Sequence, residues 1–153
     1  ACSPITGMSA EYAEFDGSPM SRKLGWSNDR HDWFYSDSYR TAANIGLDYE
    51  WFGIDEGQCA AVDRLQEFLL EDARRNQFHT YEINGTVAQS DVLHPVAIIA
   101  TVAQGSLAAN NPFMNEWIER FWNTPMRTGV RRYYDNCLYF FAFLALSGKY
   151  RIW

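Results

Sequence analysis

The feature that most constrains the fold is an alternation of two kinds of helical segment along the chain. Three segments are apolar around most of their circumference, namely Ser38 to Trp51, Pro95 to Ala109 and Tyr134 to Ser147. Between them lie two segments that carry a single apolar stripe, Gln58 to Arg75 and Asn111 to Trp122. A helix that is apolar on all sides is buried, whereas a helix with one apolar stripe lies at the surface. The pattern therefore predicts two layers of helices with antiparallel neighbours.

This alternation favours an all-α fold, an α/α barrel in which inner and outer helices alternate. A plain helix bundle would instead make every helix amphipathic. Five helices cannot close a barrel of two layers, so we expect residues 1–153 to be the C-terminal portion of one domain whose N-terminal portion is not in this chain. We expect long loops at the barrel mouth, including Ala1 to Phe34 and a hairpin at Asn84-Gly85.

Composition argues against several classes of partner. The formal net charge of -6 lacks the basic footprint that nucleic-acid binding requires. No apolar run is long enough to cross a bilayer, so we expect no membrane partner. The three cysteines are odd in number and far apart and lack CxxC spacing, which argues against a disulfide framework and a zinc site and suits a reducing cytoplasm. No metal-ligand spacing or phosphate-binding loop appears, so we expect neither a metal nor a cofactor. The 6 Trp, 9 Tyr and 10 Phe are typical either of carbohydrate binding or of a large aromatic core.

The N-terminal ends of the three apolar segments carry the polar side chains of most chemical interest. Asp37 precedes the first segment and His94 the second, while Arg132 and Asp135 lie at the start of the third. Asp37 has an ordinary explanation as a helix cap, and His94 as a loop histidine. Arg132 and Asp135 could likewise form a simple ion pair. If the inner helices are parallel, these side chains converge at one mouth and form a candidate active site.

Four blocks of the sequence together resemble glycoside hydrolase family 8, and most of all its reducing-end xylose-releasing exo-oligoxylanases. The blocks are Ser36 to Gly46, Leu93 to Pro95, Phe121 to Pro125 and Arg131 to Tyr139. The stretch from Gly25 to Trp33 resembles the family least. The resemblance implies a bacterial enzyme with an (α/α)6 barrel as its catalytic domain, in agreement with the two layers predicted from the helices.

The resemblance implies that Asp37 is the general base, within an Asp-x-x-Arg pattern completed by Arg40. Inverting hydrolysis needs one carboxylate to activate water and one carboxylic acid to protonate the leaving oxygen, about 6.5–9.5 Å apart. Family members carry that acid, a Glu, on an early helix of the barrel, and no part of this chain resembles its motif. We therefore expect an N-terminal portion of the same enzyme to supply the Glu, and the chain to be inactive without it.

The resemblance also implies the substrate contacts. His94 matches the histidine that contacts the reducing-end sugar, and its turn would limit the leaving group to one xylose. Arg40, Tyr134, Arg132 and Tyr39 are further candidates for binding the xylo-oligosaccharide. Two alternatives stay open. One is an endo-β-1,4-glycanase of the same family, acting as xylanase, cellulase or chitosanase, and the other is a helical sugar-binding fragment without catalysis.

Overall fold

The computed structural model describes residues 2–21, 30–53 and 55–152. Five helices and three short strands are described, in the order β1 (Trp33–Phe34), α1 (Arg40–Phe52), α2 (Glu56–Arg75), β2 (Thr80–Glu82), β3 (Val87–Gln89), α3 (Pro95–Gly105), α4 (Met114–Asn123) and α5 (Arg132–Leu146). A 3₁₀ turn, Ser36–Tyr39, leads into α1. Much of the stretch from Gly25 to Trp33, which resembles the family least, lies outside the described residues.

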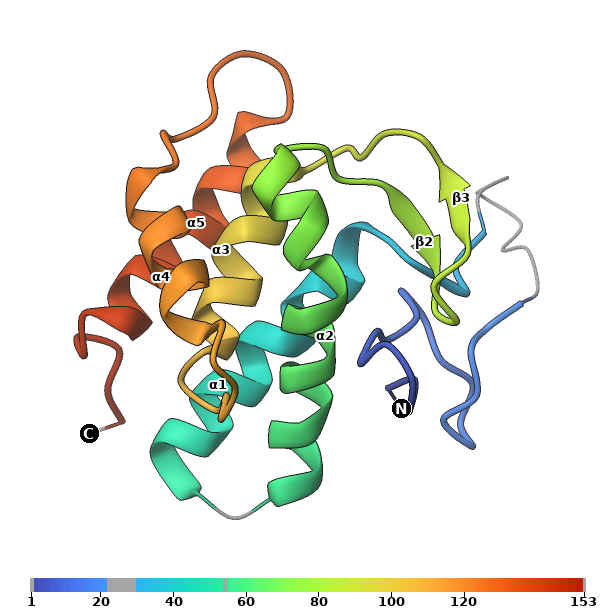
Figure 1. Cartoon of the computed structure of the whole chain (residues 1–153), viewed down its shortest axis with the longest axis horizontal. Coiled ribbons are helices and arrows are strands. Elements are labelled where there is room, and N and C mark those ends of the chain that lie inside the picture. The colour runs from blue at the N-terminus through green and yellow to red at the C-terminus, as the bar shows by residue number, and fades with distance from the viewer. Residues whose placement is uncertain (1, 22–29, 54, 153) are drawn as a thin grey trace.

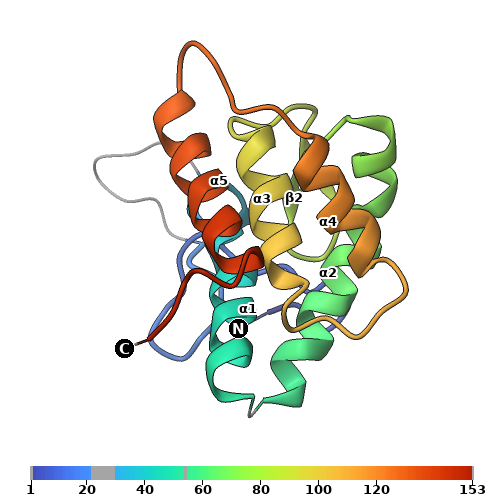
Figure 2. The same cartoon turned by 90° about the vertical axis from the view of Figure 1, so that its left-hand side faces the viewer.

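The helices form two layers around α3. Helices α1, α3 and α5 run in one direction, and α2 and α4 return in the opposite direction (Figures 1 and 2). Helix α3 packs against all four of the others. All of its residues from Ala97 to Gly105 are buried. The predicted alternation is therefore confirmed for α3 as a buried helix and for α2 and α4 as amphipathic ones, while closure into a barrel stays a prediction.

Helices α1 and α5, which the sequence pattern predicts to be buried, each bury one face only within the described residues. Along α5 the buried residues include Leu138, Ala142 and Ala145. On the other side Phe140, Phe141 and Phe143 are 56%, 43% and 44% exposed. The physical reason is a lack of cover, since the described residues shield this aromatic face only in part. A helix that is apolar all round thus lies at one side of the described structure.

The predicted all-α class is confirmed only in part, because a small antiparallel sheet accompanies the helices. Its strand order is β1-β2-β3. The hairpin predicted at Asn84-Gly85 is confirmed, with Gly85 at a φ of 98° that favours glycine. Strand β1 pairs with β2 through Phe34 and Tyr81. Because β1 runs directly into the 3₁₀ turn, this sheet holds the chain immediately before Asp37.

The contact between α1 and α3 is unusually close because it uses a glycine. A Cβ atom at Gly46 would lie 2.4 Å from the backbone oxygen of Gln104, so no other residue fits without a shift. The buried side chain of Gln104 also donates a hydrogen bond from Nε2 to the carbonyl of Ala43, at 3.0 Å. These contacts fix α1 against α3, and so fix how the turn before α1 lies relative to the start of α3.

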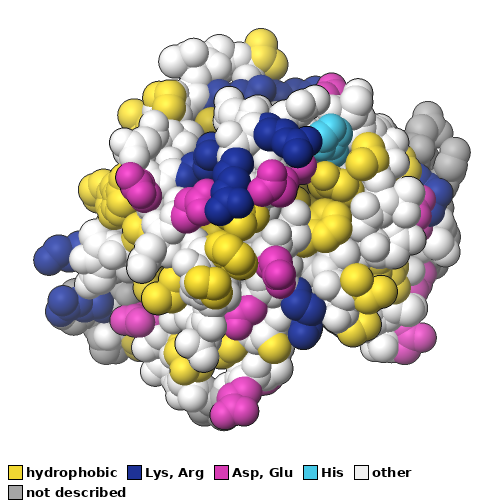
Figure 3. Space-filling view, in the orientation of Figure 1, with side chains coloured by type: hydrophobic (Ala, Val, Ile, Leu, Met, Phe, Trp, Pro, Cys, Tyr) yellow, Lys and Arg dark blue, Asp and Glu magenta, His cyan; other side chains and the backbone are white. Residues whose placement is uncertain are grey.

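The face of the molecule seen in Figure 1 carries charges of both signs. Figure 3 shows Lys and Arg side chains interspersed with Asp and Glu across this side of the molecule. Arg74 of α2 donates two hydrogen bonds to Glu116 of α4, both at 2.9 Å. Among the helices in the described ranges, none has both the length and the apolar character needed to cross a bilayer.

Candidate active site

Asp37 lies in the 3₁₀ turn, where its carboxylate is partly open to solvent. Its side chain is 33% exposed, and Oδ2 lies 3.1 Å from a guanidinium nitrogen of Arg40. The preceding residue, Ser36, has a φ of 39°, a left-handed conformation that is unfavourable for residues other than glycine. A strained backbone at this point turns the chain from β1 into the helix and presents the Asp37–Arg40 pair at the surface.

Asp37 does not occupy the N-cap position that would explain it without chemistry. The residue before the turn is Tyr35, and its backbone N–H donates to Ser38 Oγ at 2.8 Å. Asp37 itself lies within the turn rather than at the cap.

Tyr134 connects the Asp37 turn to α5. Its hydroxyl donates a hydrogen bond to the carbonyl of Ser36 at 2.9 Å. The pKa of Tyr134 is raised, first by burial and then by the negative charge of Asp37. The ring also lies against that of His94, with centroids 4.4 Å apart. Tyr134, a predicted substrate contact, thus touches both the segment that carries Asp37 and His94.

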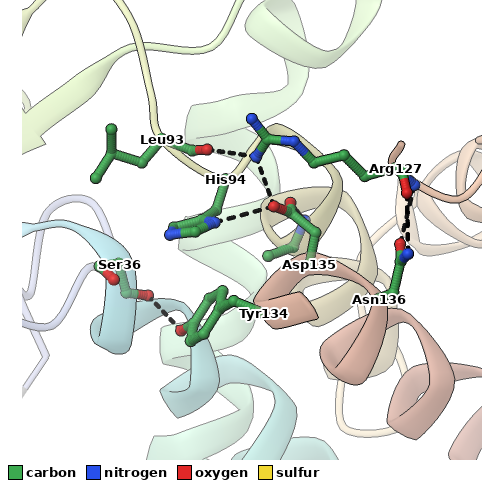
Figure 4. Close-up of polar contacts among 8 residues, drawn as sticks. Ser36, Leu93, His94, Arg127, Tyr134, Asp135 and Asn136 are labelled. Atoms are coloured by element: carbon green, nitrogen blue, oxygen red, sulfur yellow. Dashed lines mark hydrogen bonds and ion pairs between the residues drawn. The ribbon is translucent and has the colours of Figure 1, made fainter. Parts of the chain in front are cut away.

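His94 lies at the N-terminus of α3, and its ring is held by a side chain of α5. It is the residue before Pro95, which occupies the first helical position and stiffens the start of the helix. The imidazole is 10% exposed, and its Nδ1 lies 2.9 Å from Oδ2 of Asp135 (Figure 4). The turn that carries His94 is therefore tied to the first turn of α5.

Asp135 is fully buried and forms a network of hydrogen bonds. Its carboxylate accepts from the backbone N–H of Ala97 at 2.9 Å and from Arg127 Nη1 at 2.6 Å, in addition to its contact with His94. Burial alone would raise the pKa of Asp135, but the hydrogen bonds from His94, Arg127 and Ala97 together lower it below its ordinary value. The ordinary explanation of Asp135 as the ion-pair partner of Arg132 does not hold, because its partner is Arg127.

Two of the predicted substrate contacts lie apart from this cluster. Arg132 is exposed on another side of α5, where it donates to the carbonyl of Gly129 at 3.0 Å and lines a shallow hollow with Tyr133 and Phe140. Tyr39 is 1% exposed and packs edge-on against Phe34, which makes it part of the core. A buried phenol cannot contact a sugar in this arrangement, so the structure corrects the assignment of Tyr39.

Sequence reasoning missed Arg127. It lies in the connection between α4 and α5, where its backbone N–H donates to Asn136 Oδ1 and its carbonyl accepts from Asn136 Nδ2, both at 2.9 Å. Its side chain reaches Asp135 and the carbonyl of Leu93. A single arginine in a loop gives no periodic signal. Its position just after the Phe121 to Pro125 block was the one feature of the sequence that could have identified it.

Glu11 is a second residue near the site that the sequence analysis did not select. Its carboxylate is 7% exposed and lies 2.6 Å from Nδ1 of His31. Its charge is among the causes that raise the pKa of Tyr134, after burial and the charge of Asp37. Within the described ranges, no group of three metal-binding side chains lies close enough together to hold an ion.

The chain is similar over its whole length to bacterial exo-oligoxylanases. It is 50% identical over 153 residues to the reducing-end xylose-releasing exo-oligoxylanase Rex8A of Paenibacillus barcinonensis, covering 100% of this chain and 39% of that protein. It is 52% identical over 158 residues to the reducing end xylose-releasing exo-oligoxylanase of Bifidobacterium adolescentis, covering 99% of this chain and 40% of that relative. The chain thus spans about two fifths of the length of these relatives.

Solved structures show the same similarity in three dimensions. The structure of Rex8A complexed with xylose superposes with a TM-score of 0.92 at 48% identity, covering 99% of this chain and 39% of that one. A crystal structure of a reducing-end-xylose releasing exo-oligoxylanase superposes with a TM-score of 0.90, also at 48% identity, covering 100% and 39%. A mutant of Rex8A has been solved with an arabinofuranosyl-xylotetraose. No protein-family model matches the sequence.

Proposed function

We propose that this chain is the base-bearing C-terminal portion of an inverting glycoside hydrolase that releases xylose from the reducing end of xylo-oligosaccharides. The observation that carries the proposal is the connection between the Asp37–Arg40 pair and His94 through Tyr134. Similarity over the full chain to exo-oligoxylanases supports the same substrate class. Inverting hydrolysis needs a carboxylate that can reach a water molecule, and Asp37 is partly exposed.

In the proposed reaction Asp37 acts as the general base. Its carboxylate takes a proton from a water molecule, and the water oxygen forms a bond to the anomeric carbon of the sugar on the non-reducing side. The bond from that carbon to the oxygen of the terminal xylose breaks, and a carboxylic acid protonates the departing oxygen. Arg40, at 3.1 Å, keeps the carboxylate oriented and offers further donors to the sugar.

The turn from Leu93 to Pro95 accounts for the release of a single xylose. Its backbone is held by Arg127 through the Leu93 carbonyl, and Pro95 fixes the direction in which the chain enters α3. A turn held at both sides makes a rigid wall, and a wall beyond the scissile bond leaves room for one sugar. His94, on this turn, would hydrogen-bond that sugar and align it for departure.

The proton donor would come from an N-terminal portion of the same enzyme. None of the acidic residues in this chain resembles the family's acid. The partly exposed aromatic face of α5, formed by Phe140, Phe141 and Phe143, supports a further layer of helices packed against it. The relatives are more than twice as long as this chain, which leaves ample length for those helices.

The test compares residues 1–153 with the complete protein on xylotriose. We expect the complete protein to release xylose and xylobiose, with the xylobiose first seen by NMR as its α-anomer because the mechanism inverts. The chain alone should release nothing, since without a proton donor the sugar oxygen is a poor leaving group.

Each other outcome identifies an alternative. Rapid cleavage of polymeric xylan into mixed oligosaccharides would favour the endo-glycanase. Binding of xylotriose without any hydrolysis by the complete protein would favour a sugar-binding protein. Xylose release by the chain alone would refute the need for an N-terminal portion, and a β-anomer as first product would refute inversion.

A further inference from the structure

The contacts of His94 determine which of its two ring nitrogens carries the hydrogen. An ionised carboxylate can only accept hydrogen bonds, and the Asp135 carboxylate already accepts from Ala97 and Arg127. Its third contact, with His94 Nδ1 at 2.9 Å, therefore requires that Nδ1 carry the hydrogen. Nε2 points away from Asp135 (Figure 4) and has no partner in the part of the chain that the structure describes. In the neutral ring, Nε2 is then a hydrogen-bond acceptor.

The Asp135 carboxylate holds the backbone at the start of α3 as well as the His94 ring. The N–H of Ala97 is one of the donors left unpaired at the start of α3, and Asp135 satisfies it from the neighbouring helix. Arg127 compensates the buried charge of Asp135 and also donates to the Leu93 carbonyl at 2.5 Å. The backbone of Arg127 is held in turn by Asn136. Backbone and imidazole of the turn are thus fixed by one group.

We propose that Asp135, supported by Arg127, is a positioning residue for specificity, which fixes the His94 ring so that Nε2 accepts a hydrogen bond from a hydroxyl of the departing xylose. The inference rests on the proposed function and goes beyond it, because it assigns the selectivity to a buried carboxylate that never touches sugar. A loop histidine without this partner would turn freely and would present either nitrogen, as a donor or as an acceptor.

The test is a double-mutant cycle in the complete protein, with Asp135→Asn, His94→Ala and the combination. The amide introduced by Asp135→Asn keeps a single oxygen. With that oxygen accepting from the Ala97 N–H, the NH₂ group faces His94, so Nδ1 must accept and Nε2 becomes a donor. We expect Asp135→Asn to raise KM for xylotriose about tenfold, the equivalent of one lost hydrogen bond, with kcat changed less than about threefold. In the His94→Ala background the same change should have no further effect on KM.

A matched control is Asp63→Asn. Asp63 also accepts hydrogen bonds from two donors, the backbone N–H of Asn110 and the side chain of Asn111, but at the opposite end of α3. We expect the KM of Asp63→Asn for xylotriose to equal that of the wild type. Wild-type KM in Asp135→Asn, or additive effects of Asp135→Asn and His94→Ala, would overturn the proposal.

A measurement on the unmutated protein covers the case in which Asp135→Asn does not fold. In a sample labelled with ¹⁵N-histidine, the ring signals of His94 are assigned by their loss in His94→Ala. The proposal expects the hydrogen on Nδ1 alone, and a hydrogen on Nε2, with or without one on Nδ1, overturns it. If the wild type releases no xylose, the proposed function fails, and the ring signals still decide whether Asp135 fixes His94.

Discussion

The two sides of the candidate site are built in opposite ways. Asp37 has a side chain that is 33% exposed, and its ion-pair partner, Arg40, is itself 50% exposed. His94 is 10% exposed, and the carboxylate behind it, Asp135, is fully buried. One side is open and loosely paired, whereas the other is buried and bonded through several groups.

The difference fits the two roles that we propose for these residues. A general base must reach a water molecule and take its proton, so it needs access to solvent. A group that limits which sugar can leave must keep one position, and burial with several hydrogen bonds provides that rigidity. Tyr134 joins the two sides, because its hydroxyl reaches the Asp37 turn while its ring touches His94.

The largest effect is expected on the open side. Asp37→Asn in the complete protein should lower kcat about 10²–10⁴-fold while leaving the affinity for xylotriose and the melting temperature nearly unchanged. Steady-state kinetics and calorimetry measure the two quantities separately. Asp48→Asn, an exposed carboxylate on the helix that follows, is the control and should behave as the wild type. A near-normal kcat in Asp37→Asn would remove the assignment of the base.

On the buried side a change in products is expected rather than a loss of chemistry. Replacing Leu93 and His94 by glycine, with Pro95 kept to start α3, should widen the space beyond the scissile bond. We expect KM for xylotriose to rise about tenfold, and we expect xylobiose with xylotetraose to appear beside xylose and xylopentaose as early products from xylohexaose, as chromatography would reveal. If xylose is still the sole leaving group, the turn is not the barrier.

The smallest effect is expected where the two sides meet. Tyr134→Phe removes the hydrogen bond to Ser36 and should reduce the free energy of unfolding by about 0.5–1.5 kcal/mol. The strained turn then holds Asp37 less firmly, so kcat should fall about fivefold or less. Tyr133→Phe is the matched control, because that ring is 82% exposed. Equal kinetics in the two variants would mean that Tyr134 does not couple the sides.

Much of the architecture could be predicted because it depends on local patterns. The apolar circumference of the segment from Pro95 onward predicted a buried helix, and α3 is one. Asn84-Gly85 predicted a hairpin for the same reason, since its residues favour the turn directly. For α5 the same kind of pattern predicted a buried helix, and in the described residues one aromatic side of it stays partly exposed. Burial depends on what covers a face, and the described residues cover this one only in part.

The sequence by itself determined where the polar groups stand along the chain: Asp37 before α1, His94 before Pro95, and Tyr134 with Asp135 at the start of α5. Only the tertiary structure decided how they pair. It joined Asp135 to Arg127 rather than to Arg132, and it buried Tyr39 while leaving Arg40 exposed. The reason is that periodicity acts between near neighbours in the chain. Contacts such as that of His94 with Asp135, 41 residues apart, depend on how whole helices pack.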